Sequence, residues 1–211
     1  MPKKLKLADI LDYGIYRILM VVLDLQNNHK FKKIYGDFGF GINYKKSRIR
    51  GLDSESGIVY GAIAEFIRST RKPISTLLLP GENNSIKKFY SEYFSIPKVT
   101  NAGILEGMDF FWDFEKNPPD MGKFQLIVSQ AILEHLVNPY KHFEDLSHML
   151  EIGGYLIIHT EMPGFLYHRY PIDCQRFYPD WFEEMGTRMN LRIESKNISN
   201  GHIFYMYCKD R

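Results

Sequence analysis

The sequence predicts an α/β fold, a doubly wound and mostly parallel sheet that ends in an antiparallel C-terminal hairpin. Three observations predict it. Short apolar runs alternate with amphipathic helical patterns over residues 74–160, as expected of parallel strands joined by helices. One helical pattern starts at Asn138-Pro139 and runs up to Gly153-Gly154, and both pairs are typical of helix ends. The last two strand-like runs bracket Ser199-Asn200-Gly201, which predicts the hairpin.

The elements of this fold can be assigned in chain order from residue 58 onward. Residues 58–69 carry apolar side chains at helical spacing, and residues 74–79 form an apolar run that ends at Pro80-Gly81, as a strand buried on both faces does. Further along the chain we expect a helix at 85–94, strands at 99–104 and 124–129, a helix from 138, a strand at 155–160, a helix at 179–189, and hairpin strands at 191–196 and 203–208.

The N-terminal part of the chain, residues 1–57, is expected to form an extension to the domain at 58–211. Residues 7–27 have apolar side chains every three to four positions, which predicts a helix. The spacing does not separate a helix packed on its own domain from one that contacts a partner helix, a second copy in a homodimer, or a membrane surface. Residues 28–57 show little periodicity and include the glycine cluster Gly36 to Gly41.

Composition excludes several classes of protein. The chain has 211 residues, 45% of them hydrophobic, which is enough for one domain with a core. Its formal charge of +2 provides no broad cationic field, so we expect no nucleic-acid partner. The two cysteines are too few for a disulfide scaffold and suit a reducing, cytoplasmic location.

No transmembrane segment or export signal is expected. The longest apolar run, residues 18–23, has six residues, whereas a helix needs about 20 to span a bilayer. Lys3, Lys4 and Lys6 precede it, but no small-residue cleavage site follows and charges occur throughout.

Two segments in register carry a resemblance to a known family. Residues 124–139, FQLIVSQAILEHLVNP, and residues 149–158, MLEIGGYLII, resemble the fourth-strand and helix-to-strand segments of class I S-adenosylmethionine-dependent methyltransferases. Residues 107–115 are similar to another segment of that family. The resemblance implies a Rossmann-like sheet of seven strands, methyltransferase activity and S-adenosylmethionine as cofactor. Residues 168–177 resemble a branch associated with small-molecule and surface-sugar biosynthesis, which implies a small-molecule or saccharide acceptor.

The glycine-rich cofactor turn of that family is reduced in this chain. Residues 79–85, LPGENNS, stand where the family has an acid followed by GxGxG, and only Gly81 survives. Backbone must approach the cofactor closely there, and side chains obstruct that approach. Glu82 is a candidate to replace the missing acid. Gly36 to Gly41 is a weaker alternative for the turn, because it lies too far before the fourth strand.

The other cofactor positions come from the same resemblance. The family's ribose-binding acid has no carboxylate in register here, and Asn101 or Glu106 is the candidate to replace it. Asp113 matches the acid near the adenine amino group, and the neighbouring Trp112 could stack on the ring. The expected cofactor-binding residues are Gly81, Glu82, Asn101, Trp112, Asp113 and Gln130.

Histidines are the candidates for catalysis. Methyl transfer to a hydroxyl benefits from a base, and His135, His159 and His168 fall at or after strand ends. His135 matches the family's LEH position and, with His168, is an expected catalytic residue; the alternative for His135 is a hydrogen bond that holds the helix start. Asp173 and Arg176 are expected to bind the acceptor, the alternative being an ion pair between them.

The sequence leaves two functions open. No histidine or cysteine spacing is typical of a metal site, so no metal is expected. The first function is a methyltransferase for a small molecule or saccharide. Because two of three cofactor landmarks are reduced, the second is a methyltransferase-like binding or assembly protein that has lost efficient cofactor binding.

Overall fold

The computed structural model of the chain describes residues 54–163, 165, 169, 171–199 and 201–210, with side chains from Val59 onward. The helix expected at 7–27 and the glycine cluster at 36–41 lie outside these residues.

The sheet contains seven strands in the order β3-β2-β1-β4-β5-β7-β6. The first five in that order are parallel, and β7 runs antiparallel to both β5 and β6. The predicted fold class is therefore confirmed. The strands are β1 (Thr76–Pro80), β2 (Lys98–Gly103), β3 (Phe110–Phe111), β4 (Phe124–Gln130), β5 (Leu150–Glu161), β6 (Arg192–Ser199) and β7 (His202–Cys208).

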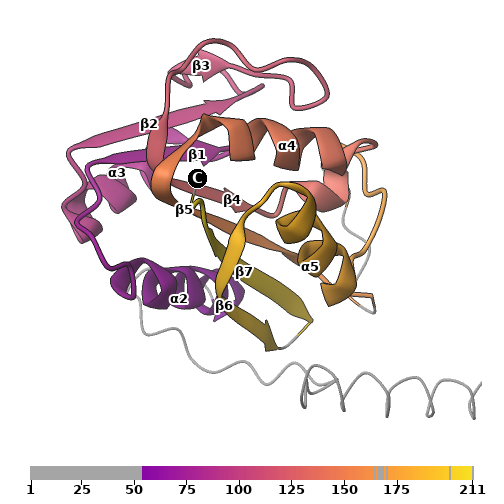
Figure 1. Cartoon of the computed structure of the whole chain (residues 1–211). Coiled ribbons are helices and arrows are strands. Elements are labelled where there is room, and N and C mark those ends of the chain that lie inside the picture. The colour runs from indigo at the N-terminus through magenta and orange to yellow at the C-terminus, as the bar shows by residue number, and fades with distance from the viewer. Residues whose placement is uncertain (1–53, 164, 166–168, 170, 200, 211) are drawn as a thin grey trace, which may run out of the picture. The chain divides into compact units, whose positions relative to one another are not determined.

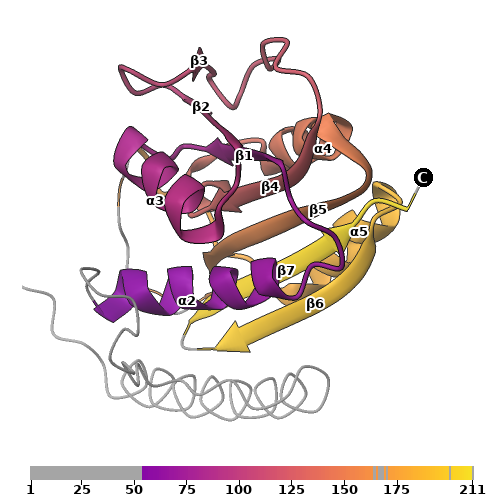
Figure 2. The same cartoon turned by 90° about the vertical axis from the view of Figure 1, so that its left-hand side faces the viewer.

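Helices cover both faces of the sheet. As Figures 1 and 2 show, α2 and α3 lie on one face and α4 and α5 on the other. Successive side chains of a strand point to opposite faces of the sheet, so one strand packs against helices on both sides. Phe204 of β7 packs in the core under α2, while its neighbour Tyr205 stacks on Phe182 of α5 with 5.0 Å between the ring centroids. The helices are α2 (Ser54–Arg68), α3 (Asn84–Phe94), the short 3-10 helix η1 (Leu133–His135), α4 (Pro139–Met149) and α5 (Pro179–Arg188).

Asparagine side chains start two of these helices. Asn83 accepts hydrogen bonds from the backbone N–H groups of Ser85 and Ile86 at 2.9 and 3.1 Å, so it caps α3. Asn138 caps α4 through the Lys141 N–H at 3.3 Å, as the Asn138-Pro139 pair predicts. Such a cap stabilises a helix by about 1 kcal/mol.

The Gly153-Gly154 pair does not end α4, contrary to the sequence analysis. The helix ends at Met149, and β5 begins at once and is longer than the predicted strand. Gly154 sits where backbone is crowded, because a Cβ there would lie 2.9 Å from the Glu151 carbonyl oxygen and 3.0 Å from that of Gln125. The glycines therefore serve an irregular stretch of β5, next to its register shift with β4.

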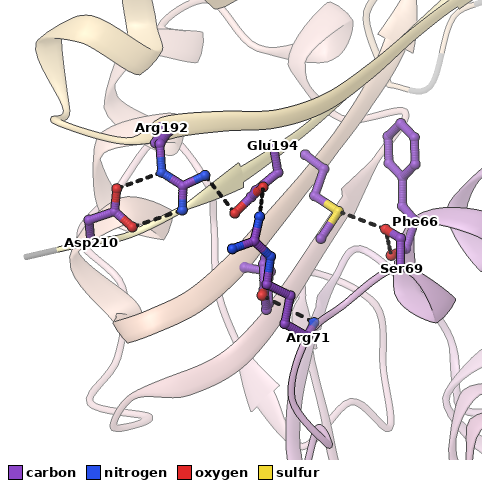
Figure 3. A network of polar contacts seen from close by, with 8 residues as sticks. Phe66, Ser69, Arg71, Arg192, Glu194 and Asp210 are labelled. Atoms are coloured by element: carbon purple, nitrogen blue, oxygen red, sulfur yellow. Dashed lines mark hydrogen bonds and ion pairs between the residues drawn. The ribbon is translucent and has the colours of Figure 1, made fainter.

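A network of ion pairs lies at the end of the sheet where the parallel strands begin (Figure 3). Arg192 bonds Asp210 at 2.7 Å and Glu194 at 2.7 Å, and Glu194 also pairs with Arg71 at 3.6 Å. The network links the loop after α2 to β6 and the end of β7. Most of its side chains are exposed, so each pair contributes at most about 1 kcal/mol.

No helix among the residues described is both long and apolar enough to cross a bilayer.

Candidate functional site

A mostly apolar pocket of about 270 Å³ opens at the carboxyl ends of the parallel strands. Gly81 follows β1, Ile104 and Leu105 follow β2, and Gln130 ends β4. The carboxyl ends of three neighbouring strands therefore contribute residues to the lining of one pocket. Ligands of open α/β sheets bind at this edge. Ile104 and Leu105 are 54% and 40% exposed, and apolar side chains exposed at a pocket are suited to being covered by a ligand.

The turn after β1 brings backbone to the pocket wall. Gly81 has a φ of +77°, which favours glycine, and its N–H donates to the Ala102 carbonyl at 2.8 Å. A Cβ at Gly81 would lie 3.2 Å from Cδ1 of Ile132, which also lines the pocket. Any side chain at Gly81 would therefore narrow the pocket, as the sequence analysis expects of a cofactor turn.

Asp113 lies in the pocket wall, and Trp112 does not. Asp113 accepts the Glu115 N–H at 3.1 Å and pairs with Lys116 at 3.0 Å, and these bonds, that from Lys116 first, lower the pKa of its carboxyl. Trp112 is buried, donates to the Lys116 carbonyl at 3.3 Å and meets Phe114 edge-on at 4.8 Å. Phe114, which sequence reasoning missed, is the aromatic ring that lines the pocket.

Glu82 and Asn101 do not line the pocket. The Tyr60 hydroxyl of α2 donates to Glu82 at 3.4 Å, and burial raises the pKa of the Glu82 carboxyl to about 7. The Asn101 amide donates to the Glu82 carbonyl at 2.9 Å and to Asn84 at 3.1 Å, and its oxygen accepts the Asp109 N–H at 3.1 Å. These side chains hold the β1 and β2 turns together and leave the hollow beside Gly81 open.

His135 lies in the pocket wall with its ring held in one orientation. Its Nδ1 is 2.5 Å from the carbonyl oxygen of Ile172. A carbonyl can only accept, so Nδ1 carries the proton and Nε2 keeps its lone pair in the neutral ring. Nε2 lies 3.8 Å from Oε1 of Glu134. The side chain is therefore prepared to accept a proton beside a carboxyl group.

Gln130 presents a buried polar atom without a protein partner. It lines the pocket at the end of β4, and its Oε1 has no hydrogen-bond partner within the described part of the chain. Buried oxygens in native proteins nearly always accept a hydrogen bond, so this atom fits a donor from a ligand.

Asp173 and Arg176 form an ion pair instead of facing the pocket. Arg176 Nη2 is 2.7 Å from Asp173 Oδ2, and the Asp173 side chain is only 2% exposed. The Cys174 N–H donates to the Glu134 carbonyl at 2.8 Å, so this segment is tied to η1. Pro171 and Ile172, just before it, line the pocket. His168 lies outside the residues described.

Comparisons with known proteins agree on the fold. No protein-family model and no curated protein matches the sequence. Solved structures do match it. The [4+2]-cyclase SpnF has a TM-score of 0.59 and 11% sequence identity over 85% of this chain and 91% of its own, and the CcbJ methyltransferase of Streptomyces caelestis has a TM-score of 0.56 and 9% identity over 71% and 88%. A TehB-like SAM-dependent methyltransferase of Corynebacterium glutamicum has a TM-score of 0.54 and 13% identity over 74% of this chain and 95% of its own. The chain has the class I methyltransferase fold.

Proposed function

We propose that this protein is an S-adenosylmethionine-dependent methyltransferase that acts on a small molecule or saccharide. The observation that carries the proposal is the pocket at the ends of β1, β2 and β4, where the Gly81 backbone, Asp113 and an oriented His135 share one hollow. Structures of the same fold include methyltransferases, and the sequence resemblance covers the segments that build this pocket.

The residues of the pocket fit the adenosyl part of the cofactor. Ile104, Leu105 and Phe114 provide an apolar surface for the adenine, and Asp113 can accept its amino group. Gln130 Oε1 offers an acceptor that the protein leaves unused. The volume of about 270 Å³ is close to the lower limit of ligand pockets, about 300 Å³, so the fit is tight.

The bound cofactor would supply a methyl group on an electrophilic sulfonium. The protein then has to align the acceptor, exclude water and take up a proton. We assign the proton to His135 Nε2, because the bond from Nδ1 to Ile172 holds the ring and the neighbouring Glu134 carboxylate would stabilise the imidazolium. His168 remains a candidate for the same role.

The acceptor side is assigned to the segment from Pro171 to Arg176. Pro171 and Ile172 would contact the acceptor, and the Asp173–Arg176 ion pair would hold the segment in place. The charge of +2 favours a small molecule or saccharide over a nucleic acid. The two free cysteines, Cys174 and Cys208, suit the cytoplasm. A homodimer through the N-terminal helix stays a prediction.

A second function has one specific observation in its favour. Asn101, at the position of the ribose-binding acid, uses its side chain entirely within the protein. A ribose would lose a charge-assisted hydrogen bond there. This favours a binding or assembly protein in which cofactor affinity has decreased.

Titration calorimetry of the full chain with S-adenosylmethionine and its demethylated product separates the two functions. We expect one binding site with a dissociation constant below about 100 µM, and loss of most of that affinity in Gly81→Val. Gly122→Val is the matched control, because Gly122 also has a positive φ, +80°, but a Cβ there meets no atom within 4 Å. No heat at millimolar ligand would reject the methyltransferase and leave the binding protein.

A further inference from the structure

Two strands bring three potential metal ligands together outside the pocket. His159 and Glu161 are two residues apart on β5 and therefore share one face of the sheet. His202 is the first residue of β7 and pairs directly with Glu161 in the antiparallel ladder. Figure 2 shows β5 and β7 side by side. One ligand atom from each residue can be chosen so that all three lie within 4.8 Å of one another.

The cluster is buried but its polar atoms are not all satisfied. His159, Glu161 and His202 are 2%, 4% and 3% exposed. His159 Nε2 lies 3.0 Å from His202 Nδ1, yet His159 Nδ1 and Glu161 Oε2 have no hydrogen-bond partner within the described residues. Leaving a buried polar atom unpaired costs about 1–3 kcal/mol, and the unpaired Glu161 Oε2 fits a metal ligand, whereas His159 would bind through Nε2, the nitrogen that faces His202.

We propose that His159, Glu161 and His202 bind a divalent transition-metal ion, with zinc as the representative. Two imidazoles and one carboxylate are a donor set typical of zinc and iron(II), whereas calcium and magnesium prefer oxygen ligands. The 3.0 Å between the two imidazole nitrogens is close to the spacing of two nitrogens on one metal at about 2.1 Å. Burial lowers the pKa of both histidines and raises the pKa of the Glu161 carboxyl to about 10, so a metal bound here would displace the Glu161 proton.

The surroundings hold the ligands in place. The ring of His159 stacks on Phe204 at 4.6 Å, and His202 lies 5.2 Å from the ring of Phe165. Glu134, whose Oε2 accepts from Thr160 at 2.7 Å, hydrogen-bonds Glu161 and adds a second carboxyl group beside the site. Three protein ligands leave at least one coordination position for water or another donor.

The site adjoins the pocket. His159 pairs in register with Gln130 of β4, so both side chains are on the same face of neighbouring strands, and Gln130 lines the pocket. We therefore place the metal next to the Gln130 end of the pocket. The proposal does not depend on cofactor binding, since the metal ligands and the Gly81 turn belong to different strands.

The test uses the full chain without an affinity tag, stripped of metal by a chelator and titrated with Co²⁺ and Zn²⁺. We expect one equivalent of Co²⁺ to bind with visible ligand-field absorption. Saturating Zn²⁺ should raise the melting temperature by roughly 5 °C or more. His202→Gln and Glu161→Gln should each weaken metal binding at least tenfold. His148→Gln, which removes an exposed histidine of α4, should leave it unchanged.

Two results would overturn the proposal. One is a wild-type protein that takes up no Co²⁺ and shows no Zn²⁺-dependent stabilisation. The other is a folded His202→Gln or Glu161→Gln variant that binds metal as the wild type does. If neither variant folds, X-ray absorption of the Zn²⁺-loaded wild type decides the question: two imidazole ligands are expected, and sulfur ligation by Cys174 or Cys208 would contradict the site. S-adenosylmethionine titrated into the same sample reports separately on the proposed function.

Discussion

The two walls of the pocket use their polar groups in opposite ways. On the β1–β2 wall, the side chains of Glu82 and Asn101 form hydrogen bonds within the protein and do not line the pocket. The pocket is lined there by the Gly81 backbone and by apolar side chains. On the β4–η1 wall, Gln130 and His135 reach the pocket itself. The difference indicates that one wall holds a ligand mainly by shape, while the other carries the groups able to react. Changes to the polar side chains of the first wall should therefore affect stability, and changes to those of the second should affect turnover.

The largest expected effect is on turnover, from a change at His135 on the β4–η1 wall. His135→Ala should lower turnover about 100-fold or more, because it removes the base, while cofactor affinity stays within about twofold. His135→Gln is the matched variant, since its amide can donate to the Ile172 carbonyl but cannot accept a proton at neutral pH. Steady-state rates and calorimetry measure both quantities. Full rescue of turnover by glutamine would show that His135 only positions the segment.

Changes to the polar side chains of the β1–β2 wall should alter the stability of the protein. Asn101→Ala removes three side-chain hydrogen bonds, to the Glu82 carbonyl, the Asn84 side chain and the Asp109 N–H. We expect a loss of about 2–3 kcal/mol in the free energy of unfolding, measured by urea denaturation. A variant with wild-type stability but greatly reduced cofactor affinity would instead place Asn101 on the ligand.

Glu82 should make the stability of the same wall depend on pH. Burial raises the pKa of the Glu82 carboxyl from its ordinary value of 4.5 to about 7 in the folded protein, so its contribution to stability is fully present below pH 4.5 and is lost as pH rises above 4.5 and through 7. Glu82→Gln should therefore be more stable than the wild type at pH 8, by roughly 2 kcal/mol, and similar to it at pH 4.5. Thermal unfolding at the two pH values measures this. A difference that does not change with pH would contradict the buried carboxyl.

The smallest effect is expected at Asp113, on the rim of the pocket. Asp113→Ala should weaken S-adenosylmethionine binding about tenfold, because the adenine amino group loses its acceptor. Its side chain is 32% exposed, so water compensates in part. Asp120→Ala is the control, since Asp120 is an exposed acid of the same loop that does not line the pocket. Equal affinity of both variants would remove Asp113 from the adenine site.

Much of the fold could be predicted because its signals are local. Asn138-Pro139 starts a helix by capping chemistry, and the apolar run of β1 is buried on both faces wherever it lies in the sheet. The Gly153-Gly154 pair misled because glycine is typical both of a helix end and of a crowded strand. Only the pairing of β5 with β4 distinguishes the two. The two-residue strand β3 is too short to produce a periodic signal.

The site could be predicted only for residues whose position follows from the strands and from the family resemblance, and not for the directions of side chains. Gly81 follows β1 directly, so its place at the pocket follows from register, whereas Asp113 and His135 are identified only through the family resemblance. Whether a side chain such as Asn101 faces the ligand or the protein depends on neighbours distant in sequence. The cluster of His159, Glu161 and His202 has no sequence spacing typical of a metal site, because strand pairing alone brings it together.

A crystal structure of the protein with S-adenosylhomocysteine, the demethylated product, tests the central claim most directly. We expect the adenosine between Phe114 and Leu105, with its amino group at Asp113 and the sulfur side directed toward His135. A ligand bound elsewhere, or a pocket that stays empty at saturating ligand, would contradict the account.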